Sequence, residues 1–169
     1  GIKCLLSDSP ENSYLLAQDL DDLNTDRKLI EAGMQKEALK QLDSVGSLQN
    51  VKSSVCLFKS EWHQGVIGII ASRVKDRMHR PTIIFADAQN GELKGSGRSI
   101  PGVHLRDVLD EVATQNPGLL TKFGGHAMAA GLSLPAHRFD EFVQAFDACV
   151  ECHLTEDMKR PIIYSDGSL

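Results

Sequence analysis

Short β-branched or apolar segments alternate with helical segments along most of this chain, and that alternation restricts the fold more than any other feature. The pattern predicts strands at residues 54–59, 82–86, 92–98, 127–134 and 160–164. It predicts helices at residues 65–78 and 104–114, and a Phe-rich helix after Ala136. Because alternating strands and helices form a sheet covered by those helices, we predict an α/β fold with a mixed β-sheet flanked by helices.

A long helix is expected to precede this sheet, at residues 10–43. Ser9 can cap its first turn, and Pro10 suits the first helical position. Its apolar residues form one narrow stripe: Leu16, Leu20, Leu23, Ile30 and Met34. A stripe this narrow indicates a connecting arm that packs on a neighbour rather than on the main core. Gly46 and the polar residues 47–50 are expected to end the helix.

The chain of 169 residues is long enough for one ordinary domain with an arm. We predict three parts: a connector at 1–50, a substrate-binding domain at 51–155 and a linker towards a further domain at 156–169. The start at Gly1, without an initiator Met or signal pattern, predicts a piece of a longer cytoplasmic protein. No apolar run reaches the roughly 20 residues that span a membrane.

Two cysteines near the C-terminus match a pattern for covalent haem attachment, Cys149-x-x-Cys152-His153. The surrounding apolar residues recur at helical spacing, so both cysteines are expected on an amphipathic helix. Covalent haem chemistry belongs to exported proteins, and this chain has no export signal. We therefore predict reduced thiols, no haem and no metal site.

Positive charge is concentrated in one part of the chain. Residues 51–106 contain nine Lys and Arg against four Asp and Glu, a net charge of +5, whereas the remainder carries −10. This asymmetry favours an anion-binding face in an otherwise acidic protein. The alternative is a solvated helix face formed by Arg73, Lys75, Arg77 and Arg80.

Two glycine-rich segments are candidates for holding a phosphate. In the first, glycine amides can point at one anion while serine hydroxyls and a guanidinium donate to it. Its residues are Gly95, Ser96, Gly97, Arg98 and Ser99. The alternative is a β-hairpin or bulge. In the second, Gly124 and Gly125 permit close approach to the backbone, and His126 can donate to an oxygen or act as an acid. A structural histidine is the alternative there.

The only tryptophan, Trp62, and His63 stand just before a helix that begins near Gly65. A helix N-terminus attracts anions, and an indole face can stack on a base. A buried tryptophan that anchors the helix entry is the other reading. Gly68 is expected to permit close packing between helix and sheet.

Taken in order, these motifs resemble the DHH-associated domain of the RecJ family of single-strand DNA exonucleases. The resemblance rests on segments 62–73, 95–99 and 124–131, and on 20–31, which is similar to that family's helix joining its two core domains. Gln64 departs from the Pro expected in many relatives. The resemblance implies a 5′→3′ exonuclease acting on single-stranded DNA in repair and recombination. It also implies that Mn²⁺ or Mg²⁺ is held by a separate DHH domain.

By the same resemblance, Ser96 and Arg98 would contact a DNA phosphate near the 5′ end. Gly124, Gly125 and His126 would line the cleft, with Trp62 and His63 close by. The sequence has no Asp-His-His triplet, and its acidic group Asp19, Asp21 and Asp22 falls on the arm helix. We therefore expect this chain alone to be catalytically silent and to bind DNA only weakly.

Other functions fit parts of the same pattern. The chain could be the substrate domain of a small-oligonucleotide phosphodiesterase, a non-catalytic RNA- or nucleotide-binding module, or a scaffold whose glycines are structural.

Overall fold

The computed structural model describes residues 1–44, 52–160 and 167, and its central feature is a five-stranded mixed sheet. The strand order is β1-β2-β3-β5-β4, with β1 parallel to β2 and every other pair antiparallel. The strands are β1 (Val55–Phe58), β2 (Thr82–Asp87), β3 (Glu92–Arg98), β4 (Lys122–Gly125) and β5 (Ala129–Pro135). The helices are α1 (Ile2–Leu5), α2 (Pro10–Ser44), α3 (Ile67–Met78), α4 (Leu105–Gln115) and α5 (Phe139–His153). The predicted α/β class with a mixed sheet is confirmed.

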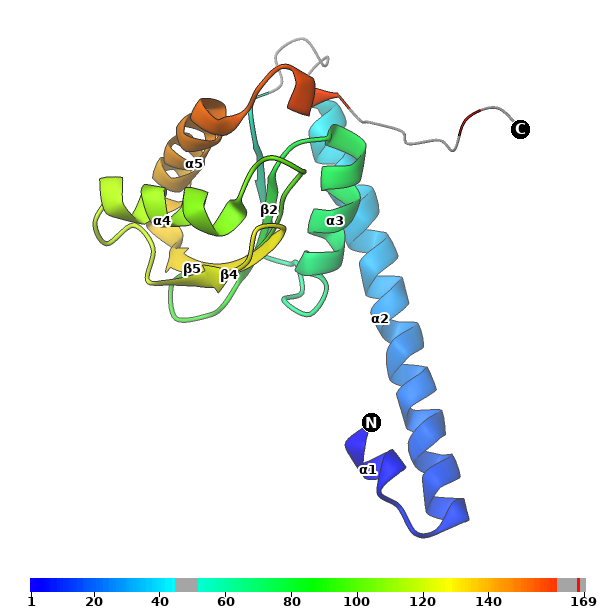
Figure 1. The fold of residues 1–169 in the computed structure, drawn as a ribbon. Helices are drawn as coiled ribbons and strands as arrows, with labels where there is room; N and C mark the ends of the chain where they lie inside the picture. The colour runs from blue at the N-terminus through cyan, green and yellow to red at the C-terminus, as the bar shows by residue number, and fades with distance from the viewer. Residues whose placement is uncertain (45–51, 161–166, 168–169) are drawn as a thin grey trace.

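The two faces of the sheet are covered by different helices (Figure 1). On one face, Ile83, Phe85 and Leu132 pack with buried residues of α4 and α5. On the other, Ile84 and Ala86 pack with α3 and with part of α2. Successive residues of β2 therefore serve opposite cores, as expected for a strand in the middle of three layers.

Helix α3 covers only part of its face. It packs on β2 and β3, while Gly124 of β4 and Gly131 of β5 remain exposed. A Cβ placed on Gly124 would have no heavy atom within 4 Å. In the described part of the chain, the β5–β4 side of this face is therefore open.

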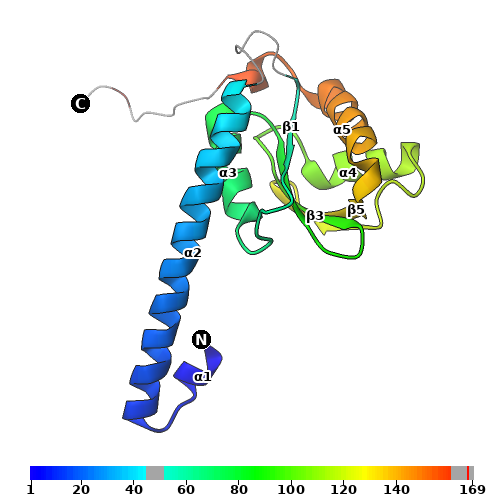
Figure 2. The same cartoon turned by 180° about the vertical axis from the view of Figure 1, so that it is seen from behind.

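The predicted long helix is confirmed, and it extends away from the sheet with α1 folded back beside its start (Figures 1 and 2). Ser9 Oγ accepts from the amide of Asn12 at 3.4 Å, as expected for the cap. Only the far end of the helix reaches the domain, where Met34 is buried against α3. Leu23 and Ile30, in the same predicted stripe, are 64% and 42% exposed.

A carboxylate fixes α2 to the domain. Glu37 Oε2 accepts from Trp62 Nε1 and from Lys59 Nζ, both at 3.0 Å. The indole hydrogen bond, followed by the Lys59 ammonium, lowers the pKa of Glu37. Trp62 is 3% exposed, so its N–H depends on this acceptor.

Some element predictions were wrong. Gly124 and Gly125 were expected in a turn, but they end the edge strand β4, which pairs with β5. Helix α3 begins at Ile67 rather than Gly65, because Gly65 lies in a turn where its amide donates to His63 Nδ1. The predicted end of the long helix at 46–50 and most of the strand at 160–164 lie outside the described residues. Among the described helices, none is both long and apolar enough to cross a membrane.

The packing of β3 predicts that Gly95→Ala destabilises the domain. A Cβ on Gly95 would lie 2.6 Å from Phe85 Cε1 and 2.8 Å from Leu132 Cδ2 in a closed core. We expect a loss of about 1–3 kcal/mol in the free energy of unfolding, measured by urea titration. Gly131→Ala, on the open face, is the matched control and should change stability little. Equal effects of the two substitutions would contradict this packing.

The link between α2 and the domain predicts that Glu37→Ala lowers stability at neutral pH. A carboxyl whose pKa is lowered by folding stabilises the fold above its unfolded pKa, about 4.3, and this contribution disappears as the pH falls through the folded value. The difference in unfolding free energy between wild type and variant should therefore be constant above about pH 5 and shrink in more acidic solution. Glu61→Ala, at a carboxylate that accepts no hydrogen bond from the described residues, is the control. A difference independent of pH would contradict the role of the Glu37 charge.

Candidate functional site

The part of the sheet that α3 leaves uncovered, together with the edge of β3 beside it, is called the open face here. Strand register places its residues in four rows. The rows are Arg98 and Ala129; Ser96, Gly131 and Gly124; Lys94, Ser133 and Lys122; and, at the far end, Glu92 and Pro135. A Cβ added at Gly95 or Gly97 would point into the core on the opposite face of the sheet. Because side chains alternate along a strand, Ser96 and Arg98 point to the open face.

Arg98 lies where the open face meets helix α3. Its Nη1 donates to Ser96 Oγ at 3.3 Å and to Gly97 O at 2.8 Å. A Cβ on Gly68 of α3 would be 3.1 Å from Arg98 Nη2 and 3.0 Å from Ser96 Oγ. Gly68 therefore permits the close packing of helix and sheet that the sequence predicted.

The guanidinium of Arg98 has unused binding capacity. It is half-buried, and no carboxylate of the described residues lies within ion-pair distance of it. A guanidinium has five N–H donors, and among the described residues only those of Nη1 have acceptors. An arginine without a carboxylate partner can offer a fork of parallel donors to a phosphate.

The predicted cradle of glycine amides does not form. Gly95 and Gly97 lie in β3, paired with β2 on one side and β5 on the other, so their amides belong to the sheet ladders. Ser99 is buried, and its Oγ donates to Val103 O at 2.6 Å. Of the predicted segment 95–99, only Ser96 and Arg98 present side chains to the open face.

The hairpin between β4 and β5 places His126 at the Arg98 end of the face. The His126 amide donates to Ala129 O at 2.8 Å, and Ala129 pairs with Arg98. The His126 residue itself is exposed. Gly125 has a φ of 148°, and a Cβ there would lie 2.4 Å from Ala129 O. Only glycine therefore fits at that position.

The hairpin turn is also held from outside. Ala127 O accepts from the Leu105 amide at 2.9 Å, and Met128 O accepts from the Ser99 amide at 3.0 Å. These bonds join the turn to the segment that follows β3. The two glycine-rich segments predicted from sequence therefore meet at one end of the sheet.

Trp62 is not on the open face. It is buried with Met34 and Val66 between α2 and α3, so its ring is unavailable for stacking on a base. The prediction that it lines a cleft is wrong, and the reading as a buried anchor is correct. His63 is exposed before α3, where its Nδ1 accepts from the Gly65 amide at 3.1 Å.

The helix α3 cations are engaged elsewhere. Arg73 Nη2 lies 4.0 Å from Glu31 Oε1 of α2, and Lys75 pairs with Asp76. After the helix, Arg80 Nη1 donates to Lys159 O at 3.1 Å. Positive charge on the open face comes instead from Arg98, and from Lys94 and Lys122, which were not among the predicted phosphate contacts. Their juxtaposition depends on β4, which the sequence pattern did not reveal.

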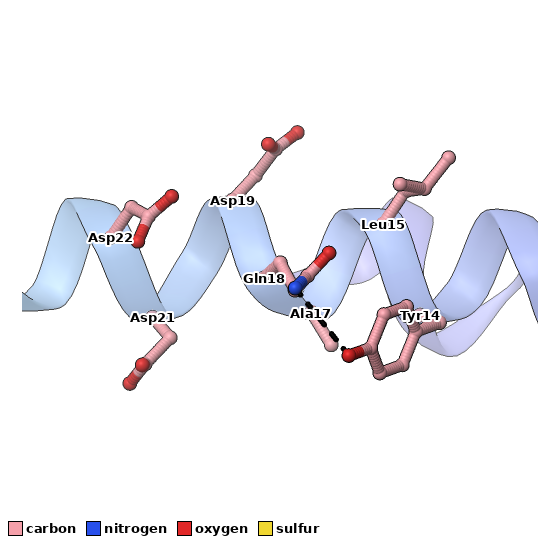
Figure 3. A pocket seen from close by; sticks show the side chains of 7 residues that line it. All are labelled: Tyr14, Leu15, Ala17, Gln18, Asp19, Asp21 and Asp22. Atoms are coloured by element: carbon pink, nitrogen blue, oxygen red, sulfur yellow. Dashed lines mark hydrogen bonds between the residues drawn. The ribbon is translucent and has the colours of Figure 1, made fainter.

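The acidic residues of α2 do not form a metal site. Figure 3 shows Asp21 projecting away from Asp19 and Asp22, on a helix surface that also carries Tyr14 and Leu15. Among the described residues, no group of three or more His, Cys, Asp or Glu is arranged to hold a metal ion.

The cysteines of the haem-like pattern lie on α5. Cys149 is buried and Cys152 is exposed, while His153 Nε2 lies 2.8 Å from Glu111 Oε2 of α4. Burial raises the pKa of Cys149, and burial likewise raises the pKa of Cys56. A raised pKa favours the protonated thiol, which is the less nucleophilic form.

Comparison with known proteins places this geometry in one family. The DHHA1 domain profile matches residues 49–151. The single-stranded-DNA-specific exonuclease RecJ of Dickeya dadantii is 50% identical over 170 residues, covering 100% of this chain and 30% of that protein. RecJ of Escherichia coli is 48% identical over the same coverage. The chain thus spans about a third of the length of these relatives.

A solved structure agrees in fold. The crystal structure of RecJ in complex with Mg²⁺ from Thermus thermophilus matches with a TM-score of 0.74 and 28% identity, covering 89% of this chain and 22% of that one. The profile matches more than half of the chain and the fold is shared, so the resemblance predicted from the sequence is confirmed. The chain belongs to the DHHA1 domain family.

Proposed function

We propose that this chain is the part of a single-stranded-DNA exonuclease that holds the phosphates of its substrate, with Ser96 and Arg98 as the contacts nearest the 5′ end. The open face is the proposed binding surface, and the proposed substrate class comes from the relatives named RecJ. On this proposal the longer protein degrades DNA from 5′ to 3′ in repair and recombination, in the cytoplasm.

The proposal rests mainly on the guanidinium of Arg98, which is available to bind an anion. It has no carboxylate partner among the described residues and lies beside the hydroxyl of Ser96. Next to it, exposed Gly131 and Gly124 present only backbone, so a strand can approach the sheet closely. A fork of N–H donors beside a surface without side chains is suited to a phosphodiester backbone, which is anionic and bulky.

The remaining predicted residues take secondary roles. Gly95 and Gly97 make room for the core, which sets the direction of Ser96 and Arg98, and Ser99 fixes the segment after β3. Gly124, Gly125 and His126 border the cleft at the Arg98 end, where the exposed imidazole can donate to a phosphate or sugar oxygen. His63, also exposed, is proposed at the border of that cleft.

Bond cleavage is assigned to another domain of the longer protein, which would hold Mn²⁺ or Mg²⁺. Structures of RecJ from Thermus thermophilus contain each of these ions. We propose that residues 51–155 bind substrate and that residues 1–50 connect to the catalytic domain. The exposed Leu20, Leu23 and Ile30 of α2 would then pack against that domain. This chain alone would not hydrolyse DNA.

Substitution of Arg98 tests the binding role. Arg98→Ala should weaken binding of 5′-phosphorylated single-stranded DNA about tenfold or more, because charge-assisted hydrogen bonds contribute about 1.5–3 kcal/mol. The slope of log affinity against log salt should fall by about 0.7 for each phosphate that the variant no longer neutralises. Affinity can be measured by fluorescence anisotropy at a series of stated salt concentrations, and Arg98→Lys should retain part of it.

Arg106→Ala is the matched control, because Arg106 is exposed on α4 at the opposite face of the sheet. Unchanged affinity and salt slope in Arg98→Ala would refute the proposal and favour a scaffold role. Parallel measurements with RNA and duplex DNA separate the exonuclease assignment from a general RNA-binding module. Preference for RNA at equal salt would favour the module.

A second variant tests whether the DNA strand lies over Gly131 and Gly124, which we call the glycine floor of the open face. Gly131→Val places a branched side chain on the open face, where the nearest heavy atom to its Cβ would be Gly95 O at 4.0 Å. The fold should tolerate it, because valine suits strands and its Cβ would meet no close neighbour. We expect an unchanged or raised melting temperature with about tenfold weaker binding of single-stranded DNA, because the side chain prevents close approach to the backbone. Undiminished binding would show that the strand runs elsewhere.

A further inference from the structure

The open face has a second cationic region, at the end opposite Arg98. Lys94 of β3, Ser133 of β5 and Lys122 of β4 lie in one row of register across three adjacent strands. Both lysines are exposed, and neither has an ion pair or hydrogen bond to any described residue. Two ammonium groups therefore flank a hydroxyl, and no carboxylate of the described residues lies within ion-pair distance of either. Glu92 of β3 lies in the next row, on the side away from Arg98.

The spacing of this row suits one anion. Neighbouring strands lie about 4.8 Å apart, so the two lysine Cα atoms are separated by about 10 Å, with Ser133 between them. A lysine side chain has four flexible carbons and an ammonium with three donors, so both can turn towards one group above Ser133. Like charges held this close repel one another unless an anion joins them.

A shallow pocket of about 280 Å³ lies at this row, lined by Lys94, Lys122, Ser133, Phe123, Leu132 and the glycines Gly95 and Gly131. Pockets that enclose small molecules are usually about 300–1,000 Å³ and bury most of the ligand. This one is at the lower limit and opens on the same face as Gly131, which is exposed. Its position therefore favours a segment of a longer ligand that continues across the face.

The two cationic ends of the face are a definite distance apart. Lys94 and Arg98 are four residues apart in β3, which corresponds to about 14 Å along the strand. A stacked nucleic acid strand carries a phosphate about every 3.4 Å of its axis, so this distance spans about four nucleotides, and fewer if the strand is extended. Between the two ends lie Ser96 and the glycine floor.

We infer that Lys94, Ser133 and Lys122 form a second phosphate-binding subsite, which takes a backbone phosphate up to about four nucleotides from the one at Arg98. The inference rests on the proposed function, since it assumes a strand already held at Arg98. It adds a direction: the strand runs along β3 from Arg98 towards Lys94, over Gly131 and Gly124.

Oligonucleotide length separates the two subsites. Binding of 5′-phosphorylated oligo-dT of about two and about eight nucleotides can be followed in this chain by amide chemical shifts in NMR, which report weak binding residue by residue. The double variant Lys94→Ala/Lys122→Ala should weaken binding of the longer strand about tenfold and reduce its salt slope by about 1.4, since two cations are removed. Binding of the short strand should be unchanged, because it cannot reach from Arg98 to the lysine row.

The control has the same change in net charge at other places. Lys52→Ala/Arg106→Ala removes two exposed cations, one before the far edge strand β1 and one on α4 across the sheet. Exposed substitutions of this kind usually change stability by less than about 0.5 kcal/mol, which thermal melting can verify for both double variants.

The outcomes distinguish this inference from the proposed function. If both double variants bind the longer strand equally well, the second subsite is wrong. Should Arg98→Ala still weaken both strands in that case, the proposed function stands alone. If Arg98→Ala changes neither strand, both proposals fall. Weaker short-strand binding in the lysine variant would also overturn the inference, because the lysines would then contact the first phosphate.

Discussion

The closeness of β3 to its neighbours is the constraint on which the rest of this structure depends. Gly95 and Gly97 lie against Phe85, Leu132 and Leu105, and a Cβ on either would come within 2.8 Å of a core side chain. A strand bears side chains alternately on its two faces, so two glycines on the core face leave Ser96 and Arg98 on the other. The packing of the hydrophobic core and the direction of the candidate binding residues are thus consequences of the same short sequence.

The second consequence is that the helix layer on the open side is incomplete. Gly68 lets α3 approach Ser96 and Arg98 closely, so the guanidinium lies against the helix and is ordered by Ser96 and the Gly97 carbonyl. Beyond Arg98, no described helix covers Gly131 and Gly124. A cation held by a rigid strand and helix keeps its position better than one on a loop, which suits recognition of a regular backbone. On the open face, the ordered donors of Ser96 and Arg98 therefore lie beside the exposed backbone of Gly131 and Gly124.

Sequence periodicity was sufficient for most of the elements and insufficient for the details of the site. The β-branched residues from Thr82 onwards indicate a strand, and the spacing of apolar residues in α4 and α5 indicates helices, so these elements could be predicted from their side chains. Gly124 and Gly125 have none, so β4 could not be distinguished from a turn, and the row of Lys94, Ser133 and Lys122 stayed hidden. Gly95 and Gly97 were ambiguous for the same reason: glycine permits an anion-binding loop and equally a crowded strand. For Trp62, the choice between stacking and burial depends on α2, which packs Met34 against it and supplies Glu37 as the acceptor of its N–H.

The distribution of charge explains how an acidic chain can present a surface to a polyanion. The net charge is −5, yet Arg98, Lys94 and Lys122 have no carboxylate partner in the described residues, whereas other cations are neutralised locally, as Lys59 is by Glu37 and Arg138 by Glu141. Charges separated by more than about 8–10 Å are largely screened at physiological salt, so a bound strand would respond to the nearby cations far more than to the distant carboxylates of α2. Local pairing, and not total charge, determines the sign of the field that a strand on the open face would meet.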